Sequence, residues 1–307
     1  MDVLSLGIFV VDVIGRPVDN FPEEGGLEVF DELEIHAGGG ANNTGIGLAK
    51  LGIDVGAAGR IGQDAFGDLV LNTLKTHNID TGGIVRDETT KTSVTFVAVA
   101  SDGERSFLHH IGANGAFSET DVNMDMLKTC KILHVAGTFV MPELDGQPTA
   151  RLLEQAQKAG VTTSLDPAWD ATGRWLKTLE PCLPHVDIFL PSIKEAEQLT
   201  GLNSPPKIAE FLMNYGIQTI GLKMGERGSY VRTVDAELYI PAFQVDVVDT
   251  TGAGDAYAAG FLAGTIKEWD LERTAQLAAA TGAACATAMG TTAGIQNLEK
   301  TLAIIKG

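Results

Sequence analysis

The chain has 307 residues, which is enough for one large α/β domain or two modest ones around a buried core. Its 22 basic and 40 acidic side chains give a formal net charge of −18, which repels the phosphate backbone of nucleic acids and anionic membrane surfaces. No stretch approaches the roughly 20 consecutive apolar residues of a membrane-spanning helix. We therefore expect neither a nucleic-acid partner nor a membrane association.

The cysteines Cys130, Cys182 and Cys285 lie in separate segments and form no CxxC pair. This usage is typical of a reducing compartment and offers no metal-ligand spacing. The first residues run directly into an apolar stretch and lack the cationic flank and cleavage site of a signal peptide. Together these features predict a cytoplasmic protein.

Short β-branched runs alternate with amphipathic stretches along the chain, which is typical of a parallel sheet covered by helices. The expected strands are residues 3–11, 55–60, 132–135, 162–165, 188–190 and 219–223, and the expected helices include 41–51, 66–77, 148–158 and 193–199. The Ala-rich segment 274–288 is expected to be a packed interior helix. No repeat or low-complexity linker divides the chain, so we predict one domain over residues 1–307.

Two segments interrupt this alternation, because residues 27–35 and 92–108 follow the period-two pattern of strands without an adjacent helix. The second segment contains Asp102-Gly103, a strong signal for a hairpin turn. We predict a small antiparallel sheet, inserted at about residues 12–37 and 90–112, that acts as a lid on the main body.

The most informative segment is DTTGAGD at residues 249–255, which leads into a helical run. A helix start has unpaired N–H groups and the positive end of the macrodipole, so it can hold a phosphate. Gly252 and Gly254 keep Cβ atoms away from such a ligand. From this local chemistry alone, Asp255 either caps the helix or acts on the ligand, and neither alternative is favoured.

This segment closely resembles the C-terminal signature of the ribokinase, or PfkB, family of carbohydrate kinases, and GGGANNTGIGLAKLG at residues 38–52 is similar to the family's N-terminal signature. Gly7, Asp12, GRIGQD at 59–64 and GAN at 112–114 extend the resemblance over essentially the whole chain. The resemblance implies a ribokinase-like α/β fold, in which helices flank a mostly parallel central sheet and a small β-sheet forms a lid. It also implies ATP- and Mg²⁺-dependent phosphorylation of a hydroxyl group.

The resemblance further implies that Asp255 is the catalytic base and that the backbone amides of Gly252, Ala253 and Gly254 form an anion hole. This agrees with the physical chemistry, since phosphoryl transfer depends mainly on in-line positioning and on neutralising charge. An ordinary aspartate has a pKa of about 4 and is ionised at neutral pH, so it can accept the proton of the attacking hydroxyl.

On the acceptor side, Asp12, Gly39, Gly40 and Asn42 match positions at which the family's sugar kinases bind hydroxyls. A carboxylate and an amide suit this task, and glycines allow the backbone to approach a sugar ring. The alternative for Asn42 and Asn43 is helix capping, and the alternative for Asp12 is a solvated strand end.

For nucleotide and metal, LPSIKEAE at residues 190–197 is similar to the family's Asn-x-x-Glu segment. Glu195 stands where the family organises Mg²⁺ through water, and Ser192 replaces the usual Asn near the triphosphate. Gly225 matches the glycine turn beside ATP. Lys223 and Arg227 flank this glycine, and surface charge is the simplest interpretation of both.

Many family members also bind K⁺ near the anion hole through backbone oxygens and an Asp. Asp249 and Thr251 are the matching positions, and Thr251 is also expected beside the nucleotide. The resemblance thus implies ATP and Mg²⁺ as cofactors and K⁺ as a further ion.

Other classes remain to be weighed. A dinucleotide-binding oxidoreductase is disfavoured because no GxGxxG run opens a helix, and a P-loop protein is disfavoured because the string GxxxxGK[ST] does not occur. A non-catalytic sugar sensor on the kinase fold is disfavoured by the presence of Asp255 and Glu195. A nucleoside kinase of the same family stays open, because residues that bind hydroxyls cannot separate a nucleoside from a free sugar.

The favoured acceptor is a free sugar such as ribose or fructose. A phosphorylated acceptor would need a basic cluster near the pocket, and the acceptor-binding glycine turn carries none, although Arg105 could still supply one charge. We also expect a homodimer formed through the lid, since an exposed sheet edge favours pairing.

Overall fold

Strands and helices alternate along the chain in the computed structural model, which describes residues 1–306. The strands are β1 (Val3–Gly7), β2 (Val10–Arg16), β3 (Glu32–Gly38), β4 (Val55–Gly62), β5 (Asp80–Asp87), β6 (Ser93–Val99), β7 (Arg105–His110), β8 (Ile132–Thr138), β9 (Thr162–Pro167), β10 (Ile188–Phe189), β11 (Thr219–Lys223), β12 (Ser229–Thr233) and β13 (Glu237–Ile240). The helices are α1 (Gly40–Lys50), α2 (Ala65–Thr76), α3 (Gly112–Gly115), α4 (Met124–Thr129), α5 (Gln147–Lys158), α6 (Leu176–Leu179), α7 (Ile193–Thr200), α8 (Pro205–Met213), α9 (Ala253–Ile266), α10 (Leu271–Cys285) and α11 (Leu298–Lys306).

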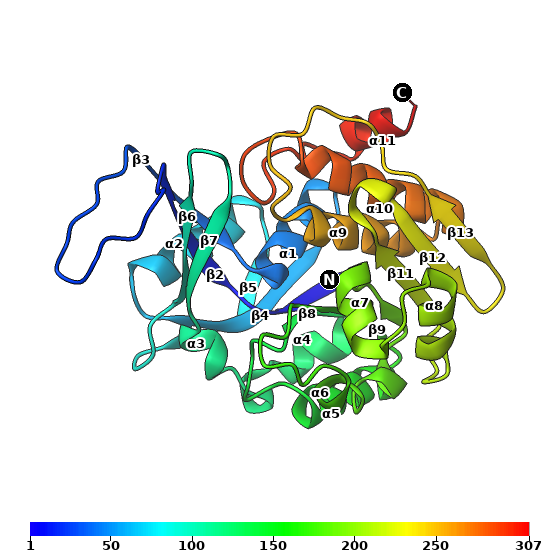
Figure 1. The fold of residues 1–307 in the computed structure, drawn as a ribbon. Helices are drawn as coiled ribbons and strands as arrows, with labels where there is room; N and C mark the ends of the chain where they lie inside the picture. Colours follow the sequence, from blue (N-terminus) through cyan, green and yellow to red (C-terminus); the bar gives the residue numbers. More distant parts are fainter. Residues whose placement is uncertain (307) are drawn as a thin grey trace.

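The main sheet has the strand order β13-β12-β11-β10-β9-β8-β1-β4-β5. Only its β11–β12 and β12–β13 pairs are antiparallel, so the predicted mostly parallel sheet is confirmed. Helices α1, α2, α9 and α10 cover one face and α4 to α8 cover the other (Figure 1). Apolar residues such as Leu48 and Phe261 on one face, and Leu153 and Phe189 on the other, fill two separate cores.

Residues 3–11 were expected to be one strand, but they divide between two sheets. β1 ends at Gly7, where a Cβ would lie 1.9 Å from the carbonyl oxygen of Ala136, and β2 starts at Val10 in the small sheet. The turn between them is held by Asn114, whose Oδ1 accepts from Phe9 N at 3.1 Å and whose Nδ2 donates to Phe9 O at 3.0 Å. The apolar sequence runs on through the turn, so it gives no sign of the change of sheet.

The small sheet, which we call the lid, has the strand order β3-β2-β6-β7 and stands beside the main body (Figure 1). Its first predicted strand was misplaced, because the strand covers Glu32–Gly38 instead of residues 27–35. The β2–β3 and β6–β7 pairs are antiparallel as predicted, whereas the central β2–β6 pair is parallel. β2 follows β1 in the chain, and β6 follows β5. Because β1 and β5 run in the same direction in the main sheet, β2 and β6 continue in that direction into the lid.

The Ala-rich segment forms most of α10, which packs closely on α9 as expected of an interior helix. A Cβ at Gly260 of α9 would lie 2.5 Å from Oγ1 of Thr281 on α10, so the glycine permits the close approach. Among the helices of residues 1–306, none is both long and apolar enough to cross a membrane.

Candidate active site

A cavity of about 730 Å³ lies at the carboxyl end of the main sheet. Its floor includes residues at the ends of β8, β9 and β11, and the start of α9 and the 242–247 loop contribute to its walls. Ligand sites of open α/β sheets lie at this edge, where loops follow the strands. The residues predicted for the site that line the cavity are Gly40, Ser192, Glu195, Gly225, Gly252, Ala253, Gly254 and Asp255.

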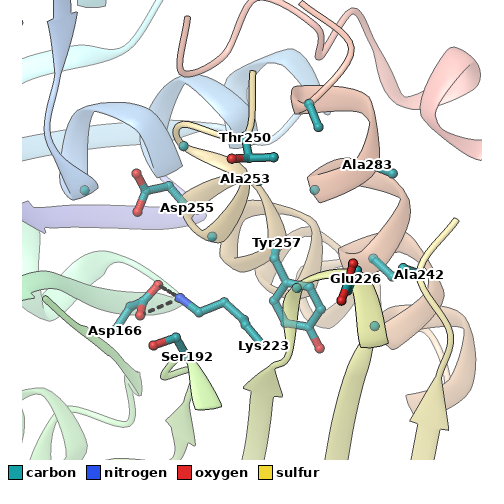
Figure 2. A pocket seen from close by; sticks show the side chains of 18 of the residues that line it. Asp166, Ser192, Lys223, Glu226, Ala242, Thr250, Ala253, Asp255, Tyr257 and Ala283 are labelled. Carbon is teal, nitrogen blue, oxygen red and sulfur yellow. Dashed lines mark hydrogen bonds and ion pairs between the residues drawn. The ribbon is translucent and has the colours of Figure 1, made fainter. Parts of the chain in front are cut away.

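Asp255 lies in the first turn of α9 and faces the cavity (Figure 2). Its Oδ2 accepts a hydrogen bond from Asn43 Nδ2 at 2.8 Å, so the side chain contacts α1 instead of capping its own helix. On the other side, a Cβ at Gly40 would lie 3.6 Å from Asp255 Oδ1. The two glycine-rich segments of the sequence thus meet at this carboxylate.

Burial raises the pKa of Asp255 above its ordinary value, while the Asn43 hydrogen bond and the nearby Lys223 ammonium lower it. The carboxylate is therefore more basic than an exposed aspartate. A base of this kind suits proton removal from a hydroxyl better than an ordinary carboxylate does.

Lys223 was interpreted from the sequence as a surface charge, and this interpretation is wrong. Its Nζ lies 2.7 Å and 2.6 Å from the two carboxylate oxygens of Asp166, inside the cavity (Figure 2). Burial alone would lower the pKa of Lys223, but the carboxylates of Asp166, Glu195 and Asp255 raise it. A fixed positive charge therefore stands among three acids at the centre of the site.

Gly252, Ala253 and Gly254 form the turn from which α9 starts. Gly252 has φ 78°, and a Cβ there would lie 2.4 Å from the carbonyl oxygen of Thr291. A Cβ at Gly254 would lie 3.5 Å from Lys223 Nζ, so the turn and the ammonium are adjacent. N–H groups at a helix start next to a cation form a suitable environment for a phosphate, although Ala253 N here donates to Thr250 O at 3.2 Å.

The predicted acceptor residues lie on α1 and on the lid. Gly39, with φ 95°, precedes α1 and no side chain caps this helix, so the capping alternative for Asn42 and Asn43 is wrong. Asn42 is fully buried inside α1 and donates to Asn43 Oδ1 at 3.2 Å, while its own Oδ1 has no protein partner. Gly40 lines the cavity, whereas Gly39 and Asn42 do not.

Asp12 is a half-buried residue of β2 and not a solvated strand end. Burial raises its pKa to about 6, and the negative charge of Asp255 contributes to this rise. The strand register places His36, Thr95 and His109 in one row with Asp12 across the lid, on one face of the sheet. Thr95 Oγ1 and His109 Nδ1 lie 3.0 Å apart. We call this face the inner face of the lid, because it carries Asp12, whose pKa is raised by burial and by the charge of Asp255.

Thr95 and His36 were not among the predicted site residues. Their signal in the sequence is the period-two alternation of the lid strands, but the strand partners are needed to bring the four polar residues into one row.

Ser192 and Glu195 start α7 as a reciprocal pair, because Ser192 N donates to Glu195 Oε2 at 2.7 Å and Glu195 N donates to Ser192 Oγ at 3.3 Å. Both also line the cavity, together with Asp166. Within residues 1–306, no group of three or more His, Cys, Asp or Glu side chains could hold a metal ion by itself. Mg²⁺ fits such a site in the manner of nucleotide enzymes, through one or two carboxylates, water and phosphate oxygens.

Asp249 and Thr251 do not line the cavity. Asp249 is 6% exposed, and its Oδ1 accepts from Thr251 N at 3.0 Å and from Thr251 Oγ1 at 2.7 Å. Arg105 of the lid also contacts this carboxylate, with Nη2 3.1 Å from Oδ1.

The chain is similar in sequence and in fold to known sugar kinases. The chain is 28% identical over 290 residues to a 2-dehydro-3-deoxygluconokinase of Bacillus subtilis, covering 91% of this chain and 89% of that protein. It is 31% identical over 283 residues to an ATP-dependent ribose-1-phosphate kinase of Halopiger xanaduensis, covering 92% and 90%. Its fold is similar to that of an Arabidopsis thaliana ribokinase solved with ribose and ATP, with a TM-score of 0.88, 22% identity and coverage of 100% and 99%.

The model of the pfkB family of carbohydrate kinases matches residues 1–298, which is nearly the whole chain. The two signature segments that meet at Asp255 are those on which the resemblance in the sequence rested. The chain belongs to the PfkB family of carbohydrate kinases.

Proposed function

We propose that this kinase transfers the γ-phosphoryl group of ATP to a hydroxyl group of a free sugar, with Asp255 as the base. The observation that carries the proposal is the position of Asp255, which faces the cavity beside Gly40 of α1 and the glycine turn of α9. In this mechanism the acceptor hydroxyl lies between Asp255 and the γ-phosphorus. Asp255 accepts the proton as the hydroxyl oxygen attacks, and Asn43 holds the carboxylate in place.

The amides of Gly252, Ala253 and Gly254 and the ammonium of Lys223 would neutralise the phosphates of ATP. Charge that is fixed in advance costs no reorganisation during the transfer, and it is worth more in a partly dry site than in water. Small residues of α10, including Ala279, Gly282 and Ala283, leave room in the cavity for the adenine, and Gly225 borders it. Mg²⁺ would be held by Glu195 through water, with Ser192 near the triphosphate, and it supplies further charge neutralisation to the phosphates.

The lid chemistry favours an uncharged acceptor. Asp12 and its row of polar neighbours can bind hydroxyls, whereas an acceptor phosphate needs a free cation. The inner face of the lid carries Arg16 and Arg105, but Arg16 is paired with Glu32 and Glu34, and Arg105 is paired with Asp249. Neither is left for a phosphate, which supports ribose, fructose or a related free sugar over a sugar phosphate.

A homodimer formed by the lid is part of this proposal. The face opposite the inner face carries an apolar row that consists of Ile35, Val13, Phe96 and Leu108, and Leu108 is 60% exposed. A second copy of the same face is the occupant that we propose, because two apolar sheet faces can cover each other around a two-fold axis. A cytoplasmic location is also proposed, since the three cysteines are buried free thiols.

The test is ADP release in the presence of ATP and Mg²⁺ with ribose, fructose, other free hexoses, 2-keto-3-deoxygluconate, adenosine and fructose 6-phosphate as acceptors. We expect turnover with one free sugar and a loss of about 10²–10⁴-fold in kcat for Asp255→Asn. Turnover with adenosine alone would favour a nucleoside kinase. ATP binding without turnover on any acceptor would favour a sensor and contradict the proposal.

A further inference from the structure

Arg105 connects the lid to the turn that precedes α9. It is the first residue of β7, and the register puts it on the inner face, four residues before His109. Its guanidinium contacts Asp249 through Nη2 at 3.1 Å and donates from Nη1 to the hydroxyl of Thr251. A residue of the lid thus contacts the segment from which the proposed anion hole starts, 146 residues further along the chain.

Asp249 organises this segment. Its Oδ1 accepts from the backbone and the side chain of Thr251, and its Oδ2 accepts from Gly290 N at 3.1 Å. The carboxylate therefore holds two stretches of chain together directly before Gly252. The charge of the carboxylate is itself nearly buried, since the side chain is 7% exposed, and a buried carboxylate needs a positive partner.

The resemblance to the family implies K⁺ at Asp249 and Thr251, and the residues present here do not fit that ion. Oδ1 of the Asp249 carboxylate already accepts from Thr251 N and Oγ1, and the guanidinium of Arg105 contacts both this oxygen and the Thr251 hydroxyl. The guanidinium supplies the positive charge that a monovalent cation would supply. A second cation beside it would be repelled.

We propose that Arg105 is the resident cation of the Asp249–Thr251 turn in place of K⁺. Arg105 is then a positioning residue that fixes the amides of residues 252–254 for the phosphate. The effect of Arg105 on turnover rests on the proposed kinase function, whereas the replacement of K⁺ by Arg105 does not.

The first experiment compares turnover in potassium chloride and in tetramethylammonium chloride at equal ionic strength, for the wild type, Arg105→Gln and the matched control Arg16→Gln. Arg16 lies on the same face of the lid, and its ion partners are Glu32 and Glu34, so its loss removes an equal charge without touching the turn. For the wild type and the control we expect less than about twofold stimulation by potassium, and for Arg105→Gln we expect kcat to fall by about tenfold or more in tetramethylammonium.

Potassium or free guanidinium should restore much of the kcat of Arg105→Gln, while the KM for ATP changes little, because the turn acts on the phosphate in the transition state. The variant Arg105→Lys keeps the positive charge, so its kcat should remain independent of potassium. This variant is the control for a loss of kcat that comes only from a failure to fold. Stimulation of the wild type by potassium of several-fold, or equal behaviour of Arg105→Gln and Arg16→Gln, would overturn the proposal.

The second experiment uses no catalysis, so it separates failure of this proposal from failure of the kinase function. Amide hydrogen exchange of residues 249–254 is measured for the same three proteins. We expect faster exchange in Arg105→Gln than in Arg16→Gln and the wild type, and slower exchange again when potassium is added. Exchange in Arg105→Gln that matches the control would contradict the role of Arg105 even if no acceptor were ever found.

Discussion

At the scale of single residues, the site is defined by the ammonium group of Lys223, which lies among the carboxylates of acidic side chains. Lys223 is bonded to Asp166 by both carboxylate oxygens, and Asp255 and Glu195 add negative charge around it. In the absence of ligand, this arrangement keeps Lys223 charged within a partly buried cavity. When ATP binds, the same charge would be directed at its phosphates, so Asp166 holds Lys223 in place between turnovers.

We predict that Lys223→Met lowers kcat by about 10²-fold or more, because a fixed positive charge near the phosphates is lost. The change also leaves Asp166 buried without a partner and should lower the free energy of unfolding by about 3–5 kcal/mol. The double variant Lys223→Met/Asp166→Asn should regain most of the stability but none of the activity. Urea unfolding and steady-state kinetics of the wild type, the single variant and the double variant test both expectations. Activity retained in the double variant would refute the role of Lys223 in phosphoryl transfer.

Asp12 offers a prediction that depends on pH. Its pKa rises from 3.8 to about 6 in the folded protein, so the ionised carboxylate costs stability above about pH 6 and costs nothing below about pH 4. Asp12→Asn should therefore raise the free energy of unfolding by about 1–3 kcal/mol at about pH 8, without effect at about pH 4. It should also raise the KM for the acceptor.

The exposed turn residue Asp235 provides a matched control, since Asp235→Asn should change neither quantity. Equal unfolding curves for Asp12→Asn and the wild type at high pH would show that ionised Asp12 carries no such cost.

At the scale of elements, the sequence predicted the strands and helices of the main body well, because each alternation of apolar and polar residues reflects a face that packs. It failed where an element depends on a distant partner. The switch of sheet after β1 follows from the close contact of Gly7 with Ala136 and from the hydrogen bonds of Asn114 to Phe9. None of these contacts leaves a local pattern in residues 3–11.

Asn114 is the residue on which the switch between sheets depends. Asn114→Ala removes two hydrogen bonds and leaves the N–H and C=O of Phe9 without these partners in a buried turn. We predict a loss of about 2–4 kcal/mol in the free energy of unfolding. Asn123→Ala, which removes an exposed cap of α4, should cost only about 1 kcal/mol by the same urea titration. Similar losses in the two variants would mean that the turn does not need Asn114.

At the scale of the whole molecule, the proposed dimer can be tested on the outer face of the lid. Leu108→Glu puts a charge into an apolar row that is exposed in the single chain, so it should separate the dimer without harming the fold. Val234→Glu is the control, since Val234 is 70% exposed in the turn between β12 and β13. Sedimentation should give a dimer for the wild type and the control and a monomer for Leu108→Glu. A wild type that sediments as a monomer would contradict the proposal.

The candidate site was predictable in part at this scale. The two glycine-rich segments and Asp255 were found because their local pattern resembles a family signature. Lys223, Asn43 and Arg105 gain their importance from contacts with residues far away in the chain, such as the Asn43–Asp255 bond, which spans 212 residues. A buried lysine and a surface lysine look alike in a sequence, and only the fold separates them.

The strand order also has a consequence for synthesis on the ribosome. β1 is fully buried between β4 and β8, but β8 follows in the sequence only after the lid is complete. Until Ile132–Thr138 emerges, one side of β1 can pair with any extended segment, including another nascent chain. Translation pauses before residue 138 should therefore lower the yield of this enzyme.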